Sequence, residues 1–230
     1  MTKRLYWENP YRREFEARVV ALDGNEVILD ETCFYPRGGG QVSDTGVIDS
    51  VRVIDVVDNE EGRISHVLEK PLSKMVGDKI HAEIDWEKRH RTMRLHSASH
   101  ILYYVMQEVF GGEVKPASSG LVDEKKDRTD YLFETSLDQK KLKETEGKVN
   151  EIIRAAHEIK TWNEPSQNGK RMWKLDPFPV MMCGGTHVKN TKEIGQVEVS
   201  RGKKPGRGKE RIEITFEEQT NAITTTVEKT

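Results

Sequence analysis

Short runs in which apolar and polar residues alternate occupy the chain from Phe15 to about Asp85. The candidate strands are residues 15–22, 26–29, 46–57, 63–68 and 79–84. Turn residues separate these runs, such as Asp23-Gly24-Asn25 between the first two. A series of short strands without a long helix is typical of a small β-barrel. The pattern therefore predicts a barrel at the N-terminal end of the chain.

The hydrophobic period becomes helical after Asp85. Residues 86–110 contain neither glycine nor proline, and Gly111-Gly112 follows them. The apolar positions that recur at helical spacing in this segment include Leu95, Leu102, Val105 and Val109. The segment is predicted to be a long helix that opens a second domain.

The rest of the chain mixes helix and strand signals. Candidate strands are residues 119–122, 131–133, 196–200 and 211–216, an amphipathic helix covers 137–159, and a polar, proline-containing loop covers 163–179. The predicted fold class is therefore α+β, with a small β-barrel domain at residues 1–85 followed by an α+β domain at residues 86–230.

The charge balance limits how the chain could bind a polyanion. Charged residues make up 33 % of the 230 residues, but 37 basic and 39 acidic side chains give a net charge of only −2. Whole-molecule attraction to nucleic acid or acidic lipid is thus excluded as a main mechanism, and any polyanion must meet a local basic patch.

Two local basic patches exist. Lys88, Arg91 and Arg94 lie at the start of the long predicted helix, where cations oppose the helix dipole and an anionic partner would relieve the conflict. Arg201, Lys203, Lys204 and Arg207 lie with several glycines between two predicted strands, in a loop that could follow phosphates without reading sequence. The alternatives are a solvated, salt-bridged helix face and a solvated hairpin tip.

Cysteine usage and hydropathy indicate the compartment. Cys33 and Cys183 are the only two cysteines and cannot build a disulfide framework, which favours a reducing environment. The first twenty residues hold no continuous apolar segment of the kind found in signal peptides. We therefore expect a cytoplasmic protein that does not span or bind membranes.

Two short segments carry a metal-ligand pattern. His96 and His100 are four residues apart on the long predicted helix, so both rings lie on one face about 6 Å apart. Cys183 and His187 lie on either side of a glycine turn, and together the four residues make a tetrahedral set of the ligand types that zinc prefers. We expect one zinc ion per chain. Ser97 stands where zinc proteases carry their glutamate, which disfavours peptide hydrolysis, and a purely structural zinc site stays open.

These segments also carry a family resemblance. His96-Ser-Ala-Ser-His100 followed by Cys183-Gly-Gly-Thr-His187 resembles the editing domain of alanyl-tRNA synthetase and the free-standing AlaX family of alanyl-tRNA editing proteins, medium type. The stretch Phe34-Tyr-Pro-Arg-Gly-Gly-Gly-Gln41-Val-Ser-Asp-Thr-Gly46 is similar to the glycine-rich stretch that precedes that domain. Glu210-Arg211-Ile-Glu-Ile214 resembles the arginine-containing strand that follows it. The similarity covers roughly residues 15–217.

The resemblance implies a fold and an activity. The second domain is expected to be a zinc-containing editing domain of the threonyl/alanyl-tRNA synthetase type. The chain is expected to deacylate alanine tRNA mischarged with serine, with glycine as a second candidate, and to need no obligate protein partner. Gln41 is the candidate catalytic residue, while Gly38, Gly39, Gly40, Thr186 and Arg211 are candidate substrate-binding residues. Without the resemblance, the three glycines would be interpreted as an ordinary barrel turn.

Two functions of other classes compete with this one. The first is a non-catalytic RNA-binding module with structural zinc, and the second is a metallo-hydrolase of small esters that uses the same four ligands. Deacylation assays on charged tRNA and on free seryl esters distinguish the three hypotheses.

Overall fold

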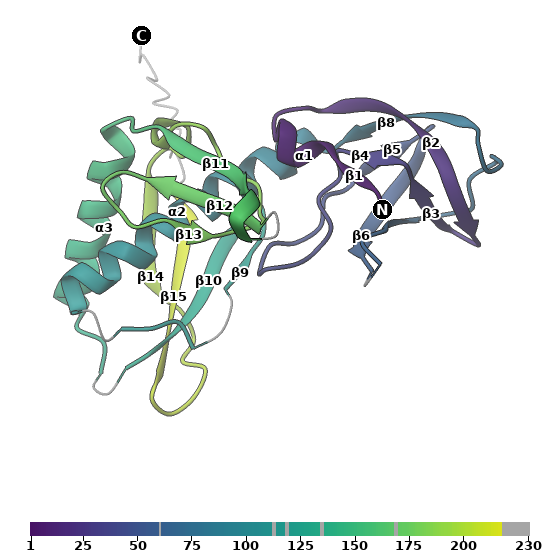
Figure 1. Ribbon diagram of the computed structural model, residues 1–230. Coiled ribbons are helices and arrows are strands. Elements are labelled where there is room, and N and C mark those ends of the chain that lie inside the picture. Colours follow the sequence, from purple (N-terminus) through teal and green to yellow (C-terminus); the bar gives the residue numbers. More distant parts are fainter. Residues whose placement is uncertain (60, 112–113, 118–119, 134–135, 168–169, 218–230) are drawn as a thin grey trace, which may run out of the picture.

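The computed structural model describes residues 1–59, 61–111, 114–117, 120–133, 136–167 and 170–217. Two lobes follow one another along the chain, with the N-terminal lobe in purple to blue and the second lobe in teal to yellow (Figure 1). Six strands close the first lobe into a barrel in the order β2-β3-β7-β6-β5-β8, which confirms the predicted barrel. These strands are β2 (Glu14–Asp23), β3 (Glu26–Leu29), β5 (Gly46–Ile48), β6 (Val51–Asp58), β7 (Ile64–Leu68) and β8 (Lys79–Ile84).

Alternation of side chains explains the barrel. Along the first half of β2, Phe15, Ala17 and Val19 point into the core while the residues between them face solvent. Residues before and between the strands add a helical turn, α1 (Leu5–Glu8), and a short parallel pair, β1 (Lys3–Arg4) with β4 (Glu31–Thr32). The sequence had given no sign of these three elements.

The predicted strand at 46–57 is wrong in one respect. It is a hairpin, since Ile48 pairs with Val51 and the two residues between them, Asp49 and Ser50, both have positive φ angles of 44° and 70°. Two positive φ values are what a tight hairpin turn requires, but Asp-Ser lacks the glycine that usually marks such a turn.

The second lobe is built on α2 (Trp86–Phe110), whose bounds agree with the predicted helix. The Asp85 side chain caps it by accepting a hydrogen bond from Lys88 N at 3.1 Å, and Gly111 ends it with a φ of +93°. Helix α2 packs on the inner face of a sheet in the order β14-β15-β10-β9 and against α3 (Gln139–Arg154). The sheet strands are β9 (Leu121–Val122), β10 (Lys126–Leu132), β14 (Val197–Arg201) and β15 (Lys209–Phe216).

The predicted helix at 137–159 and the predicted loop at 163–179 both need correction. Helix α3 ends at Arg154, and Ala156 has a φ of +57° that turns the chain away. The chain then forms a second sheet, β11-β12-β13, where a loop was expected. Its strands are β11 (Ile159–Glu164), β12 (Lys170–Leu175) and β13 (Met181–Met182). A 3-10 turn at Pro165–Gln167 lies between the first two strands, and another at Thr191–Glu193 follows the sheet.

Two predicted strands in this lobe have different bounds. Strand β10 begins at Lys126 rather than at residue 131, because its first residues are polar and carry no strand signal. Strand β9 begins at Leu121, and residue 119 of the predicted strand lies outside the described residues. The α+β fold class is nevertheless confirmed by the barrel, the two sheets and the two long helices.

A buried ion pair joins the two lobes. Arg89 of α2 is fully buried, and its Nε donates to Asp44 of the glycine-rich stretch at 2.9 Å. The same guanidinium donates to the carbonyl oxygens of Pro10 and Cys33. Breaking such a pair by removing one partner costs about 3–5 kcal/mol, so it fixes the glycine-rich stretch against α2.

Each lobe has its own apolar core. One cluster extends from Leu5 to Ile84 and the other from Met93 to Ile214, and Trp86 packs against both. We propose the domain boundary at residues 85/86 on this basis, with residues 218–230 of the second domain outside the described residues. Among the described residues, no helix combines the length and apolar character needed to cross a membrane.

Candidate metal centre

Four predicted ligands from two distant segments meet in the second lobe. The ligand atoms of His96, His100, Cys183 and His187 all lie within 4.8 Å of one another. Helix α2 supplies the first two rings, and the turn after β13 supplies the thiol and the third ring. Cys183 Sγ lies 3.5 Å from His96 Nε2 and 3.2 Å from His187 Nε2. A single metal ion could therefore contact all four side chains.

A hydrogen bond from His96 to Gln41 fixes the orientation of the His96 ring. Gln41 Oε1 accepts a bond from the backbone N–H of Thr186 at 3.0 Å, which identifies that atom as the oxygen. The same oxygen lies 2.8 Å from His96 Nδ1, so Nδ1 must carry the proton and donate it. The lone pair of His96 is then on Nε2, which faces Cys183.

Ser97 sets the tautomer of His187 in the same way. The Ser97 hydroxyl donates its proton to the Met93 carbonyl oxygen at 2.8 Å, so its oxygen accepts from other groups. His187 Nδ1 lies 3.2 Å from that oxygen and donates to it, which leaves Nε2 free for a metal. Held rings with a free Nε2 are the usual arrangement at protein metal sites.

Burial controls the protonation of the cluster. It lowers the pKa of His96 to about 4 and lowers the pKa of His100 and His187 well below the usual value, so the three rings are neutral and able to coordinate. Burial also raises the pKa of the Cys183 thiol to about 11. A neighbouring cation would stabilise the thiolate, so the donor set suits a metal ion that binds imidazole and thiolate.

Two glycines allow the close packing around the cluster. A Cβ atom on Gly185 would lie 2.2 Å from Cε1 of His96 and 2.8 Å from Oε1 of Gln41, whereas a Cβ on Gly184 would meet nothing within 4 Å. A Cβ on Gly40 would lie 2.3 Å from the carbonyl oxygen of Gly120. That contact is where the glycine-rich stretch docks on β9, with Val42 N donating to Val122 O and Val122 N to Gly40 O.

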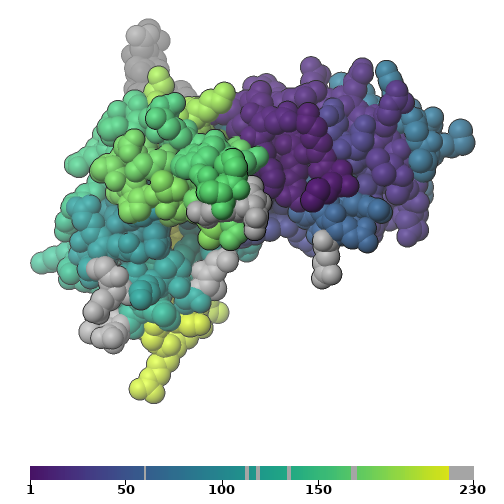
Figure 2. All heavy atoms as spheres, in the orientation of Figure 1, coloured from purple at the N-terminus to yellow at the C-terminus, as the bar shows by residue number. Residues whose placement is uncertain are grey.

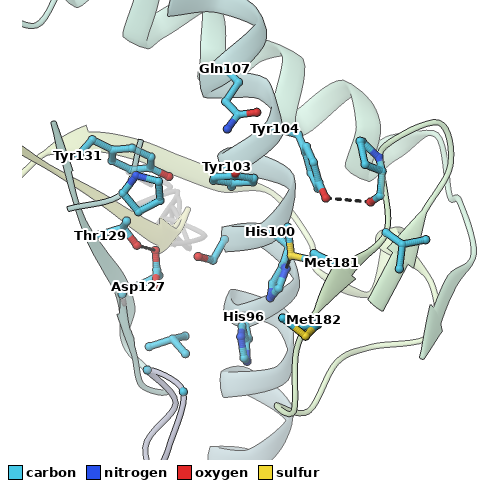
Figure 3. A pocket seen from close by; sticks show the side chains of 18 residues that line it. His96, His100, Tyr103, Tyr104, Gln107, Asp127, Thr129, Tyr131, Met181 and Met182 are labelled. Atoms are coloured by element: carbon cyan, nitrogen blue, oxygen red, sulfur yellow. Dashed lines mark hydrogen bonds between the residues drawn. The ribbon is translucent and has the colours of Figure 1, made fainter. Parts of the chain in front are cut away.

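A cavity of about 590 Å³ opens beside two of the ligands. On one wall, α2 presents His96, Ser99, His100, Tyr103 and Gln107, and on the other β10 presents Asp127, Thr129 and Tyr131 (Figure 3). Gly39 and Gly40 also line the cavity, and Met181 and Met182 from β13 lie on the side of the histidines. The volume is within the range of pockets that hold small ligands or cofactors.

Asp127 is a cavity residue that the sequence patterns did not predict. This carboxylate is 1 % exposed, and burial raises its pKa to about 7, while hydrogen bonding from Ser99 and Thr129 acts in the opposite direction. The alternation of Asp127, Thr129 and Tyr131 at every second residue was a signal for a strand facing a pocket. It was not recognised because three of the four residues from 127 to 130 are charged.

Curated proteins match nearly the whole chain. An alanyl-tRNA editing protein AlaX-M from Pyrococcus horikoshii is 38 % identical over 94 % of this chain and 99 % of its own length. A second AlaX-M protein, from Saccharolobus solfataricus, is 34 % identical over 94 % of this chain and 99 % of its own length. This chain belongs to the AlaX family of alanyl-tRNA editing proteins. An alanine–tRNA ligase from Methanococcus aeolicus is 33 % identical over 93 % of this chain, which matches 25 % of the ligase.

Family models agree with membership of the AlaX family. A model of class II (A) tRNA synthetases matches residues 7–88, and a model of the threonyl and alanyl tRNA synthetase second additional domain matches residues 167–213. The second match contains Cys183 and His187, and the first contains the glycine-rich stretch. The resemblance drawn from the sequence motifs is thereby confirmed.

The other predicted site residues of this AlaX-family chain lie in three places: behind His96, along the cavity and on the opposite face of the sheet. Gln41 is 2 % exposed, and its Nε2 donates to Thr186 Oγ1 at 3.0 Å, so these two lie behind His96. Gly39 and Gly40 line the cavity, while Gly38 O accepts from the Tyr35 hydroxyl. Arg211 on β15 forms an ion pair with Asp130 at 2.7 Å. Asp130 follows Thr129 on β10, where successive side chains point to opposite faces, so this pair faces away from the cavity.

The predicted tRNA-binding residues are divided as well. Lys88, Arg91 and Arg94 donate to the backbone carbonyl oxygens of Ser43, Glu124 and Ile194, respectively. In the hairpin between β14 and β15, Arg201 and Lys204 both form ion pairs with Glu210. Lys203 and Arg207 are exposed at its tip, which projects from the second lobe (Figure 2).

Proposed function

We propose that this chain hydrolyses the ester bond of alanine tRNA that carries the wrong amino acid, with serine as the main substrate and glycine as the second. The convergence of His96, His100, Cys183 and His187 beside a cavity of about 590 Å³ is the observation that carries the proposal. Membership of a family of alanyl-tRNA editing proteins supplies the substrate class. We place the reaction in the cytoplasm, where mischarged tRNA would be available before translation.

We propose zinc as the metal that these four residues hold. Three imidazoles and one thiolate are ligands that zinc prefers over harder cations. When bound, zinc would supply a Lewis acid for the ester carbonyl or lower the pKa of a water molecule. The chain itself orients the ligands, because Gln41 holds the His96 ring and Ser97 holds the His187 ring with Nε2 directed toward the cluster.

Serine is the substrate that an alanine enzyme most needs to remove. A synthetase pocket that holds alanine rejects an analogue with one added hydroxyl poorly, so a second pocket must read that hydroxyl. The cavity of this chain is lined with polar groups such as Ser99, Thr129 and Gln107 that could pair with it. If bound alanine left such groups unpaired, the cavity could favour serine over alanine by up to ~10⁴-fold.

The glycine-rich turn, Gln41 and Thr186 act near the cavity, and the remaining basic residues act outside it. Gly39 and Gly40 let the backbone approach the substrate, and Gly38 shapes the same turn. Gln41 and Thr186 are positioning residues, because Gln41 bonds directly to His96 and Thr186 bonds to Gln41. Arg211, together with Lys88, Arg91, Arg94 and the hairpin residues Arg201, Lys203, Lys204 and Arg207, is proposed to contact the tRNA outside the cavity.

A deacylation assay tests the proposal. Purified zinc-loaded protein is incubated with alanine tRNA charged with serine, glycine or alanine, and loss of the amino acid is followed over time. We expect fast loss of serine, slower loss of glycine and little loss of alanine. Equal hydrolysis of a free seryl ester would favour a small-ester hydrolase, and tRNA binding without hydrolysis would favour a non-catalytic RNA-binding module.

Salt dependence tests the hairpin contact. Replacing Lys203 and Arg207 by alanine together should lower the slope of log affinity for tRNA against log salt by ~1.4–1.8, because each lost phosphate contact removes ~0.7–0.9. These two side chains are chosen because Arg201 and Lys204 already pair with Glu210. The matched control replaces the exposed residues Arg52 and Lys70 of the first lobe by alanine. An unchanged slope in the hairpin variant would mean that the hairpin tip does not contact tRNA.

A further inference from the structure

Asp127 lies on the wall of the cavity opposite the metal-binding helix. It shares the inner face of β10 with Thr129 and Tyr131, and across the cavity α2 presents Ser99 and Tyr103 (Figure 3). Thr129 Oγ1 donates to Asp127 Oδ2 at 3.2 Å. The carboxylate is therefore placed where a bound ligand would contact it.

The described residues provide no cation that pairs with this carboxylate. Its strand neighbours Lys126 and Arg128 point to the other face of the sheet, where they pair with Glu213 at 2.8 Å and Asp123 at 2.6 Å. Its partners across the sheet are apolar and buried, namely Val122 on β9 and Ile214 on β15. Its neighbouring donors are the hydroxyls of Ser99 and Thr129 and the backbone N–H of Arg128, none of them charged. A buried carboxylate without a cation is costly to keep.

Ser99 relates this carboxylate to the metal ligands. It follows two residues after Ser97 and directly precedes His100 on α2, so its Cα lies about 3.8 Å from that of a proposed ligand. The Ser99 hydroxyl faces Asp127, while His100 belongs to the ligand cluster. His96, His100 and Asp127 line the same cavity, so an aminoacyl ester bound there could contact the cluster with its ester and Asp127 with a substituent on its Cα.

We propose that Asp127 binds the α-ammonium group of the esterified amino acid. An aminoacyl ester carries this cation one carbon away from the ester carbonyl, and every amino acid offers it. The carboxylate thus gains the missing positive partner and holds the substrate by its backbone rather than by its side chain. An acylated amino group, as in peptidyl-tRNA, has no positive charge and would be rejected. This inference rests on the proposed function, because it assumes that aminoacyl-tRNA occupies the cavity.

Binding of stable analogues tests the inference independently of hydrolysis. The probes are alanine tRNA ending in 3′-amino-3′-deoxyadenosine with serine attached as an amide, and the same tRNA with the serine N-acetylated. Dissociation constants are measured at pH 7 for the zinc-loaded wild type, Asp127→Asn and the control Glu213→Gln. Glu213 is a carboxylate on the adjacent strand that pairs with Lys126 on the opposite face of the sheet.

The wild type and Glu213→Gln should bind the free-amino probe ~10–100-fold more tightly than the acetylated probe, as expected for a hydrogen bond between charged groups. Asp127→Asn should lose most of this ratio through weaker binding of the free-amino probe alone. An unchanged ratio in Asp127→Asn, or the absence of a preference in the wild type, would overturn the inference. Equal weakening of both probes would also overturn it, since that result means a structural role.

The same variants separate this inference from the proposed function. A wild type that prefers the free-amino amide but does not deacylate seryl-tRNA would contradict the proposed hydrolysis and leave the ammonium site supported. A wild type that deacylates seryl-tRNA while Asp127→Asn keeps the wild-type ratio would support the hydrolysis and contradict the ammonium site.

Discussion

Replacing Cys183 by alanine should remove the metal ion and with it the deacylation of seryl-tRNA. The thiol is the one ligand that carries a negative charge when bound, and its sulfur lies within 3.5 Å of Nε2 of both His96 and His187. Loss of a group that merely orients a ligand costs about 10–100-fold in metal affinity, so loss of the ligand itself should cost more than ~100-fold. Zinc content after dialysis and single-turnover deacylation should fall together.

Cys33 provides the matched control. It is also a free cysteine, but it lies fully buried in the apolar core of the first lobe and is not one of the four clustered residues. Cys33→Ala should cost about 1 kcal/mol of stability and leave one zinc ion per chain. If Cys183→Ala retained stoichiometric zinc, or if metal-free protein deacylated seryl-tRNA at the wild-type rate, the metal would have no place in the reaction.

Replacing Gly185 by alanine should disrupt the same centre without removing any ligand. The added Cβ would lie 2.2 Å from Cε1 and 2.6 Å from Nδ1 of His96, and 2.8 Å from Oε1 of Gln41. Either the ring or the turn must move, which breaks the bond between Gln41 and His96. We expect metal affinity to fall by ~10–100-fold and stability by ~1–3 kcal/mol. Chelator competition and denaturant unfolding measure the two effects.

Gly184 is the adjacent control, because a Cβ there would meet nothing within 4 Å. Gly184→Ala should keep the wild-type metal affinity. Gln41→Ala removes the hydrogen bond to His96 without a clash, so it should match Gly185→Ala in metal affinity and alter the absorption spectrum of the cobalt-substituted protein. A normal cobalt spectrum with normal affinity in Gln41→Ala would show that Gln41 does not position the ligand.

Local periodicity was enough to predict several parts of this protein. Alternating residues gave the barrel, and a long segment without glycine or proline gave α2 with its observed bounds. The spacing of His96 and His100 on that helix places both rings on one face whatever the rest of the fold is. Ordered motifs then gave the family, which the full-length relatives confirm.

Local periodicity did not predict elements whose buried positions are polar or whose turns lack glycine. Strand β10 begins with charged residues, and the turn at Asp49-Ser50 carries positive φ angles without glycine. The segment expected to be a loop forms β12, where Trp173 and Leu175 are buried against the helices of the second lobe. Strand propensity was weak there, and packing against neighbouring elements decided the structure.

Only the tertiary structure could decide which polar residues are partners. Gln41 meets His96 and Thr186, Asp44 meets Arg89, and Asp127 faces Ser99. Most of these residues are buried and come from distant parts of the sequence, and a buried polar group must find a partner wherever the chain brings one. The sequence supplied the donors and acceptors, but their pairing depends on how the barrel docks on α2 and how β10 faces that helix. These two packing arrangements place the orienting groups behind the candidate metal ligands and a carboxylate across the cavity.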